Sequence, residues 1–167
     1  MIPRLVAALL FGAGLAAAQA QSFTRHVNPR FGISLDVPSS WIARPMSDNG
    51  DGRVIVSPDG TAQVAMFGAN IQGSAAQERA RRSAPLDGET ITYRHATISR
   101  VTVSGYRNGR VFYRAGVIGC VGTVWASFDL EYPADAVARY DAVVRQMNRS
   151  LAIAMPEGAA ECDDQRR

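Results

Sequence analysis

The chain has 167 residues, of which 47% are hydrophobic and 20% charged, and this length supports one domain with its own hydrophobic core. All 18 basic residues are arginines, and they are balanced by 15 acidic residues, which leaves a formal net charge of +3. Because the acidic residues are spread along the chain, the sequence lacks the basic stripe that is typical of nucleic-acid-binding proteins.

The first twenty residues have the layout of a secretory signal peptide. Arg4 precedes an apolar run over residues 5–18, and an A-x-A pattern of small residues ends at Ala20. The apolar run is shorter than the roughly 20 residues that a membrane-spanning helix needs. We therefore expect residues 1–20 to be a signal peptide cleaved after Ala20, which makes the mature protein periplasmic or secreted, without a membrane span. The alternative is an uncleaved N-terminal anchor.

A strand and a loop follow the predicted signal peptide. Residues 31–37 alternate at period two, which predicts a strand with one buried face. Residues 47–52 read SDNGDG and resemble the start of a calcium-binding loop. Such a loop requires a bidentate Glu at its twelfth position, where this chain has Pro58. We therefore interpret the segment as a tight turn rather than a metal site.

A hairpin is predicted after this loop. Residues 53–57 and 61–69 form its strands, and Pro58-Asp59-Gly60 between them is a strong turn signal. Alternate residues of the second strand share one apolar face, namely Ala62, Val64, Met66 and Gly68.

Two helices are predicted from local signals. Ser74 followed by Gln77 matches a capping box, which predicts a short helix over Ala75–Ser83. Residues 134–151 have apolar side chains at intervals of three and four, which is typical of an amphipathic helix that packs one face down. These apolar residues are Val137, Tyr140, Val144, Met147 and Leu151.

Four more strands lie between the two helices, over residues 90–95, 98–106, 110–120 and 123–132. Asn108-Gly109 turns the second of them onto the third, and two registers are open. A two-residue turn pairs Arg107 with Arg110, whereas a three-residue turn with a glycine bulge pairs Tyr106 with Arg110. We favour the bulged register because it gathers the apolar side chains on one face. That face would hold Val101, Val103, Val111, Tyr113 and Ala115.

The bulged register also creates a patch of arginines around an aromatic residue on the opposite face. Its members are Arg100, Arg110, Phe112 and Arg114. Guanidinium groups favour carboxylates and other anions, so this arginine patch is a candidate site for an anionic ligand or partner. The alternative is a solvated sheet face, or arginine stems that lie under the last helix with only their charged ends in water.

Two cysteines, Cys120 and Cys162, occur in the chain. In an oxidising compartment an isolated pair this far apart favours a disulfide over a metal or redox site. The disulfide would tether a C-terminal tail, residues 153–167, to the strand that carries Cys120. We therefore expect a single folded domain over residues 21–152.

Several stretches together resemble one known fold. FGISLDVPSSW, residues 31–41, is similar to the first strand and Pro-x-x-Trp turn of the fold shared by the PsbP photosystem II accessory proteins and the Mog-type Ran-binding proteins. SPDGTAQVAMFG resembles the next hairpin, and residues 91–151 look like the remaining strands and final helix of a bacterial exported branch. The resemblance implies an α+β fold, a central antiparallel sheet of about six strands with helices on its faces in an α/β/α sandwich, ending in a C-terminal amphipathic helix. It also implies a non-catalytic binding or assembly role.

The candidate catalytic residues are few. His26 lies near the predicted mature N-terminus and His95 at a strand end, without a nucleophile that either would activate. Asp129 and Glu131 lie two apart on one predicted strand, but no companion with suitable spacing appears, so we interpret them as solvated. Trp125 lies among apolar neighbours, which predicts a core position.

These features favour an exported, non-catalytic accessory or binding protein of the cell envelope that acts through a protein partner. The alternative is a carrier of a small anionic ligand bound at the arginine patch. A hydrolase is the least favoured hypothesis. We expect no cofactor, no metal and no nucleic-acid partner.

Overall fold

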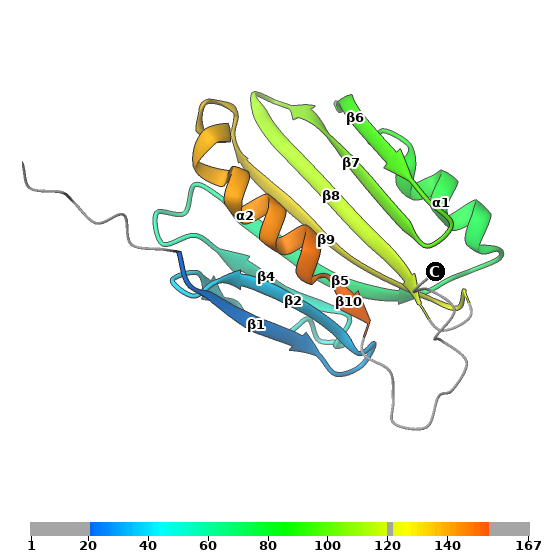
Figure 1. The fold of residues 1–167 in the computed structure, drawn as a ribbon. Coiled ribbons are helices and arrows are strands. Elements are labelled where there is room, and N and C mark those ends of the chain that lie inside the picture. Colours follow the sequence, from blue (N-terminus) through cyan, green and yellow to red (C-terminus); the bar gives the residue numbers. More distant parts are fainter. Residues whose placement is uncertain (1–20, 120–121, 154–167) are drawn as a thin grey trace, which may run out of the picture.

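The computed structural model describes residues 21–119 and 122–153. These residues form two antiparallel sheets and two α-helices (Figure 1). The predicted signal peptide and the cysteines of the predicted disulfide lie outside the described residues, so both remain predictions. Among the described residues, no helix is long and apolar enough to cross a membrane.

The larger sheet has seven strands in the order β3-β4-β5-β9-β8-β7-β6. Its strands are β3 (Ile42–Ala43), β4 (Gly52–Val56), β5 (Gln63–Asn70), β6 (Thr90–Ala96), β7 (Arg100–Arg107), β8 (Arg110–Gly119) and β9 (Val124–Pro133). Every neighbouring pair is antiparallel. This architecture confirms the predicted α+β class with a central antiparallel sheet.

The smaller sheet has three strands in the order β1-β2-β10. They are β1 (Phe23–Asn28), β2 (Ile33–Pro38) and β10 (Ala152–Ile153). Of these, the sequence predicted only β2, which is buried along most of its length. β1 is mostly exposed and β10 has two residues, so neither has a clear apolar alternation.

Helix α2 (Val137–Ser150) packs between β2 and strands β8 and β9, and a short 3₁₀ turn, Ala134–Ala136, precedes it. Figure 1 shows α2 crossing one face of the large sheet beside the small one. Its buried side chains are Tyr140, Val143 and Met147. The main core therefore lies among α2, β2 and this face of the large sheet, which we call the α2 face.

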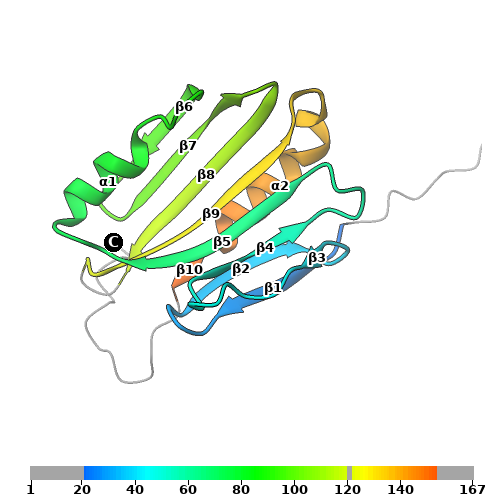
Figure 2. The same ribbon diagram turned by 180° about the vertical axis from the view of Figure 1, so that it is seen from behind.

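Helix α1 (Ala75–Ser83) packs against β7 and β6 (Figure 2). Its bounds are those predicted from the capping box, in which Ser74 Oγ accepts from the Gln77 N–H at 3.2 Å. The helix carries alanines instead of large apolar side chains, and its one buried residue is Glu78. A helix of this composition cannot fill the space beneath it, as an apolar stripe would.

The hairpin between β7 and β8 corrects the predicted register. Arg107 pairs with Arg110, so the turn has two residues and the bulged register is wrong. Asn108 and Gly109 have positive φ angles of 51° and 73°, the combination that a two-residue type I′ turn requires.

The physical reason for this error is that both faces of the hairpin are covered. A second, smaller core lies on the side opposite the α2 face, and we call that side the α1 face. Val101, Val103 and Phe112 are buried there together, whereas Val111 and Ala115 are buried in the main core. The rule that all apolar residues gather on one face therefore does not apply to these strands.

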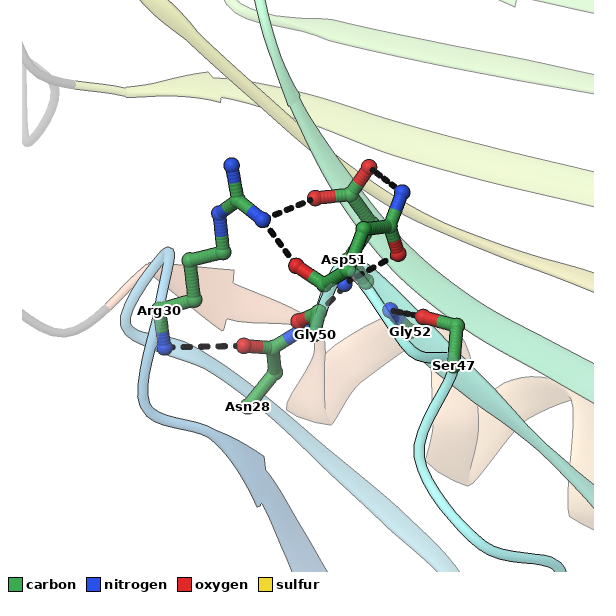
Figure 3. A network of polar contacts seen from close by, with 7 residues as sticks. Asn28, Arg30, Ser47, Gly50, Asp51 and Gly52 are labelled. Atoms are coloured by element: carbon green, nitrogen blue, oxygen red, sulfur yellow. Dashed lines mark hydrogen bonds and ion pairs between the residues drawn. The ribbon is translucent and has the colours of Figure 1, made fainter.

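A polar network fastens the turn after β1 to the loop before β4 (Figure 3). Asn28 is fully buried, and its Nδ2 donates to the carbonyls of Gly50 and Asp51 at 3.1 and 2.8 Å. Its Oδ1 accepts from the Arg30 N–H at 2.9 Å. The Arg30 guanidinium in turn lies 3.1 Å from the Asp51 carboxylate. Protein groups thus organise the segment that resembles a calcium loop, and they join it to the small sheet.

Candidate functional site

A cavity of about 300 Å³ lies between α1 and the α1 face of the large sheet. We call it the α1 cavity. Helix α1 and the segment after it contribute Arg81, Arg82, Ala84 and Leu86. Strands β7, β8 and β9 contribute Val101, Val103, Arg114, Ala115, Gly116, Trp125, Ser127 and Asp129. The cavity is present because α1 places small and charged side chains, rather than large apolar ones, toward the sheet.

Trp125 forms part of the apolar wall, and a glycine on the neighbouring strand makes room for it. A Cβ atom at Gly116 would lie 2.6 Å from Cε2 of the indole, and closer still to Cζ2 and Cη2. Only glycine at this position therefore allows the indole to lie against β8. Val101 and Val103 continue the same apolar wall along β7.

A buried charge cluster forms the helix side of the cavity. The Glu78 carboxylate accepts a hydrogen bond from Arg82 Nε at 2.8 Å and a second one from Arg81. Burial opposes ionisation of Glu78, but the hydrogen bonds from Arg81 and Arg82 prevail, so its pKa is lowered. The Arg82 guanidinium also lies 5.2 Å from the centroid of the Trp125 ring, within the range of a cation–π contact.

Asp129 is a carboxylate without a partner at the sheet side of the cavity. It is paired across the strands with Arg114. Arg114, however, donates to Glu89 at 2.5 Å and to the Ala84 carbonyl at 3.1 Å. Asp129 consequently forms no side-chain hydrogen bond or ion pair with the described residues. Burial raises the pKa of Asp129 to about 6, although Arg114 and Arg82 lower it.

The arginine patch predicted from the sequence is only partly assembled. Arg110, Phe112 and Arg114 lie at alternate positions of β8 and so share the α1 face. Arg114 Cζ lies 4.9 Å from the centroid of the Phe112 ring. Arg107, which pairs with Arg110 across the turn, forms an ion pair with Glu131 on this face. A binding role for these residues remains a prediction.

Arg100 does not belong with them. In the observed register Arg100 pairs with Val117 of β8. Odd-numbered residues of β8 point to the α2 face, whereas the patch residues on β8 are even-numbered and point to the α1 face, so Arg100 lies on the α2 face. Its guanidinium donates to the carbonyls of Asn148 and Leu151 at 3.1 and 3.3 Å, at the C-terminal end of α2. The predicted grouping of Arg100 with Arg110 and Arg114 is therefore wrong.

Sequence reasoning missed most of the cavity wall. Trp125, Ser127 and Asp129 lie at alternate positions of β9, and this period of two was the available signal. Asp129 was interpreted as solvated because the helix that covers it comes from a distant part of the sequence. Among the described residues, no three His, Cys, Asp or Glu side chains group in a way that could hold a metal ion.

The chain resembles known proteins in structure but not in sequence. No family model and no curated protein sequence matches the chain. Cyanobacterial PsbP (CyanoP) from Synechocystis has a similar structure, with a TM-score of 0.60 and 14% sequence identity, over 87% of this chain and 99% of CyanoP. The chain has the PsbP/Mog-like fold.

Two further structures share the PsbP/Mog-like fold with this chain. The Ran-binding protein Mog1p of Saccharomyces cerevisiae matches with a TM-score of 0.53 and 10% identity, over 80% of this chain and 96% of Mog1p. LpqN of Mycobacterium tuberculosis, described as involved in cell envelope biogenesis, has a TM-score of 0.53 and 18% identity, over 80% of this chain and 91% of LpqN. The resemblance predicted from the sequence is thus confirmed at the level of the fold.

Proposed function

We propose that this protein is an exported, non-catalytic binding protein of the cell envelope, and that it binds a small molecule in the α1 cavity. The observation that carries the proposal is the cavity itself, which combines an apolar wall with charged and hydrogen-bonding groups. Concave sites of this composition are typical of ligand binding.

The proposed location has separate support. The sequence predicts a signal peptide over residues 1–20, and LpqN, one of the structures with this fold, is described as involved in cell envelope biogenesis. A non-catalytic role agrees with the chemistry of the cavity, since the lining has no cysteine or histidine and Ser127 Oγ forms no hydrogen bond to Asp129 or another base.

Thermal unfolding with small aromatic probes tests the binding function. Benzyl alcohol, benzoate and benzylammonium each carry one ring of a size that suits the cavity. A bound probe at 100 times its dissociation constant stabilises the native state by about 2.7 kcal/mol, which raises the melting temperature by roughly 5–10 °C. We expect at least one probe to produce such a rise.

Two substitutions test whether the probes bind in the α1 cavity. Val103→Phe introduces a larger side chain at the cavity wall, whereas Val137→Phe makes the same change at an exposed position of α2. We expect the Val103 variant to lose the probe response and the Val137 variant to keep it. If none of the probes shifts the melting temperature, or if the response survives in the Val103 variant, the α1 cavity is not a binding site.

A protein partner is a second candidate, favoured by the outer edge of the large sheet. β6 is the last strand of that sheet, and an edge strand presents unpaired backbone groups to a partner. Tyr93, Ile98 and Tyr106 near this edge are 53%, 83% and 46% exposed. Exposed aromatic side chains are typical of protein interfaces.

Affinity purification from the native envelope tests this second candidate. The native protein serves as bait beside a Tyr93→Ser/Tyr106→Ser variant, and the Val137→Phe protein, which is changed at an exposed position of α2, serves as the control. A partner that is retained by the native and control proteins, but lost by the tyrosine variant, supports docking at β6. A partner that all three proteins retain equally contradicts it.

A further inference from the structure

The wall of the α1 cavity is apolar over much of its area. Val101, Val103 and the indole of Trp125 supply this part, and they belong to the second core. A molecule that packs against these side chains must itself have an apolar body. The volume of about 300 Å³ restricts that molecule to a compact one.

Trp125 and Ser127 also carry polar atoms without partners, but these atoms lie beneath the surface of the wall. Trp125 Nε1 and Ser127 Oγ are buried and form no hydrogen bond, and both residues are only 2% exposed. An indole N–H donates and cannot accept, whereas a serine hydroxyl can do either. Because neither atom is accessible, the polar contacts of a bound molecule must come from other side chains of the wall.

Arg82 supplies a positive charge with unused donors. Its Nε donates to Glu78, but its two terminal nitrogens form no hydrogen bond with the described residues. The guanidinium lies over the Trp125 ring, so its unused donors lie beside the apolar part of the wall. A guanidinium fork matches the two oxygens of a carboxylate.

We infer, on the basis of the binding function proposed above, that the α1 cavity selects a compact organic carboxylate, with its apolar body against the valine and indole wall and its carboxylate at Arg82. An inorganic anion would leave the apolar wall uncovered. An organic cation would leave Arg82 without an acceptor. A carboxylate on an apolar body matches both parts of the wall.

Asp129 makes this binding dependent on pH. The charged groups around its carboxylate are Arg82 from α1, Arg114 from β8, Glu131 from β9 and Glu89 from the segment before β6. Burial raises the pKa of Asp129 to about 6, against the influence of the two arginines. Below this pH the carboxyl group is neutral and can donate to the ligand, whereas above it the negative charge repels a carboxylate. Binding therefore strengthens as the pH falls through about 6.

The three aromatic probes test the selection because they share a ring and differ in charge. Their dissociation constants are measured by NMR titration of the purified protein at about pH 5.5, where benzoate is ionised. We expect benzoate to bind at least about tenfold more tightly than benzyl alcohol or benzylammonium. Equal binding of benzyl alcohol, or tighter binding of benzylammonium, overturns the carboxylate selection and leaves the cavity function intact. Failure of all three probes to bind overturns both.

Two substitutions at Arg82 test the proposed anchor. We expect Arg82→Gln to weaken benzoate binding by about tenfold and to leave benzyl alcohol binding nearly unchanged, while Arg82→Lys keeps part of the benzoate affinity. Arg145→Gln, at an exposed position of α2, is the matched control and should bind like the native protein. If the Gln variant fails to fold, the ratio of benzoate to benzyl alcohol affinity in Arg82→Lys tests the same anchor, and a ratio equal to that of the native protein overturns the proposal. Unchanged benzoate affinity in a folded Arg82→Gln protein overturns the proposal.

Asp129→Asn tests the pH dependence. In the native protein we expect benzoate affinity to fall at least about fivefold between about pH 5 and about pH 7.5. The variant, which has no carboxyl group to ionise at this position, should keep its affinity over the same range. A parallel fall in both proteins overturns the role of Asp129.

Discussion

Arg114 and Asp129 lie directly opposite each other on β8 and β9, yet the Arg114 guanidinium forms its ion pair with Glu89 instead. Glu89 belongs to the segment that links α1 to β6, so this ion pair joins that segment to the centre of the large sheet. The same ion pair leaves Asp129 without a partner in a partly apolar cavity. The unpaired carboxylate is therefore a consequence of how α1 is held in place.

The first prediction concerns the stability of the protein as the pH changes. The pKa of Asp129 is raised from 3.8 to about 6 by burial, so the native state holds this proton more tightly than the unfolded chain does. The contribution of Asp129 to the free energy of unfolding is fully present below about pH 4 and is lost as the pH rises to about 6. At neutral pH the loss amounts to about 2–3 kcal/mol at most.

Urea unfolding of the native protein and of Asp129→Asn at several pH values measures this effect. We expect the two proteins to be similar near pH 4 and the variant to be more stable at neutral pH, because asparagine does not ionise. Other groups titrate equally in both proteins, so the difference between them isolates Asp129. A difference that does not depend on pH would contradict the prediction.

The second prediction concerns Asn28, whose side chain joins the two sheets. Asn28→Ala removes the buried Nδ2 donor of two carbonyl groups and the buried Oδ1 acceptor of the Arg30 N–H. We expect a loss of about 2–4 kcal/mol in the free energy of unfolding. Asn70→Ala, at an exposed position at the end of β5, should change it by less than about 0.5 kcal/mol. Equal effects of the two substitutions would show that the network contributes little.

The third prediction concerns the contact between Gly116 and Trp125. A methyl group at position 116 overlaps the indole, so Gly116→Ala should destabilise the fold by about 1–3 kcal/mol. Trp125→Phe removes the overlapping ring atoms, at a cost of its own. We expect the double variant to lose about 1 kcal/mol less free energy of unfolding than the sum of the losses in the two single variants. Strict additivity in chemical denaturation would mean that the alanine is accommodated elsewhere.

The fourth prediction separates Arg100 from the binding residues. Arg100 donates to backbone carbonyls at the end of α2, and burial lowers its pKa, so the side chain is a structural cap of that helix. Arg100→Gln should reduce the free energy of unfolding by about 1–3 kcal/mol. The dissociation constant for benzoate should remain unchanged, in contrast to Arg82→Gln. A selective loss of benzoate binding would restore Arg100 to the predicted patch.

The elements that the sequence predicts well depend on neighbouring residues. Helix α1 has its predicted bounds because the hydrogen bonds between Ser74 and Gln77 form within one turn. The grouping of Arg110 with Arg114 on one face likewise follows from strand geometry alone and is correct in either register. Such features need no knowledge of the rest of the fold.

The features that the sequence did not predict depend on distant elements. The register of β7 and β8 was wrong because the second core beneath α1, which buries Val101 and Val103, is not visible in the hairpin itself. One residue of shift then placed Arg100 on the wrong face. Asp129 looks like an ordinary strand carboxylate until α1 covers it. The position of the α1 cavity thus depends on α1 covering one face of the large sheet, and local sequence patterns do not determine which face a helix covers.

The small sheet also governs how the domain resists a pulling force. β1 and β10 flank β2, with Phe23 opposite Pro38 at one end and Ile153 opposite Ile33 at the other. Tension between Phe23 and Ile153 therefore acts along the strands and loads their hydrogen bonds together in shear, rather than opening them one by one. β10 has two residues and β1 has six, so β10 yields first, and the tension then reaches α2. Mechanical failure of the domain would thus begin by exposing its main core, and the tension would next reach β9 and the wall of the α1 cavity.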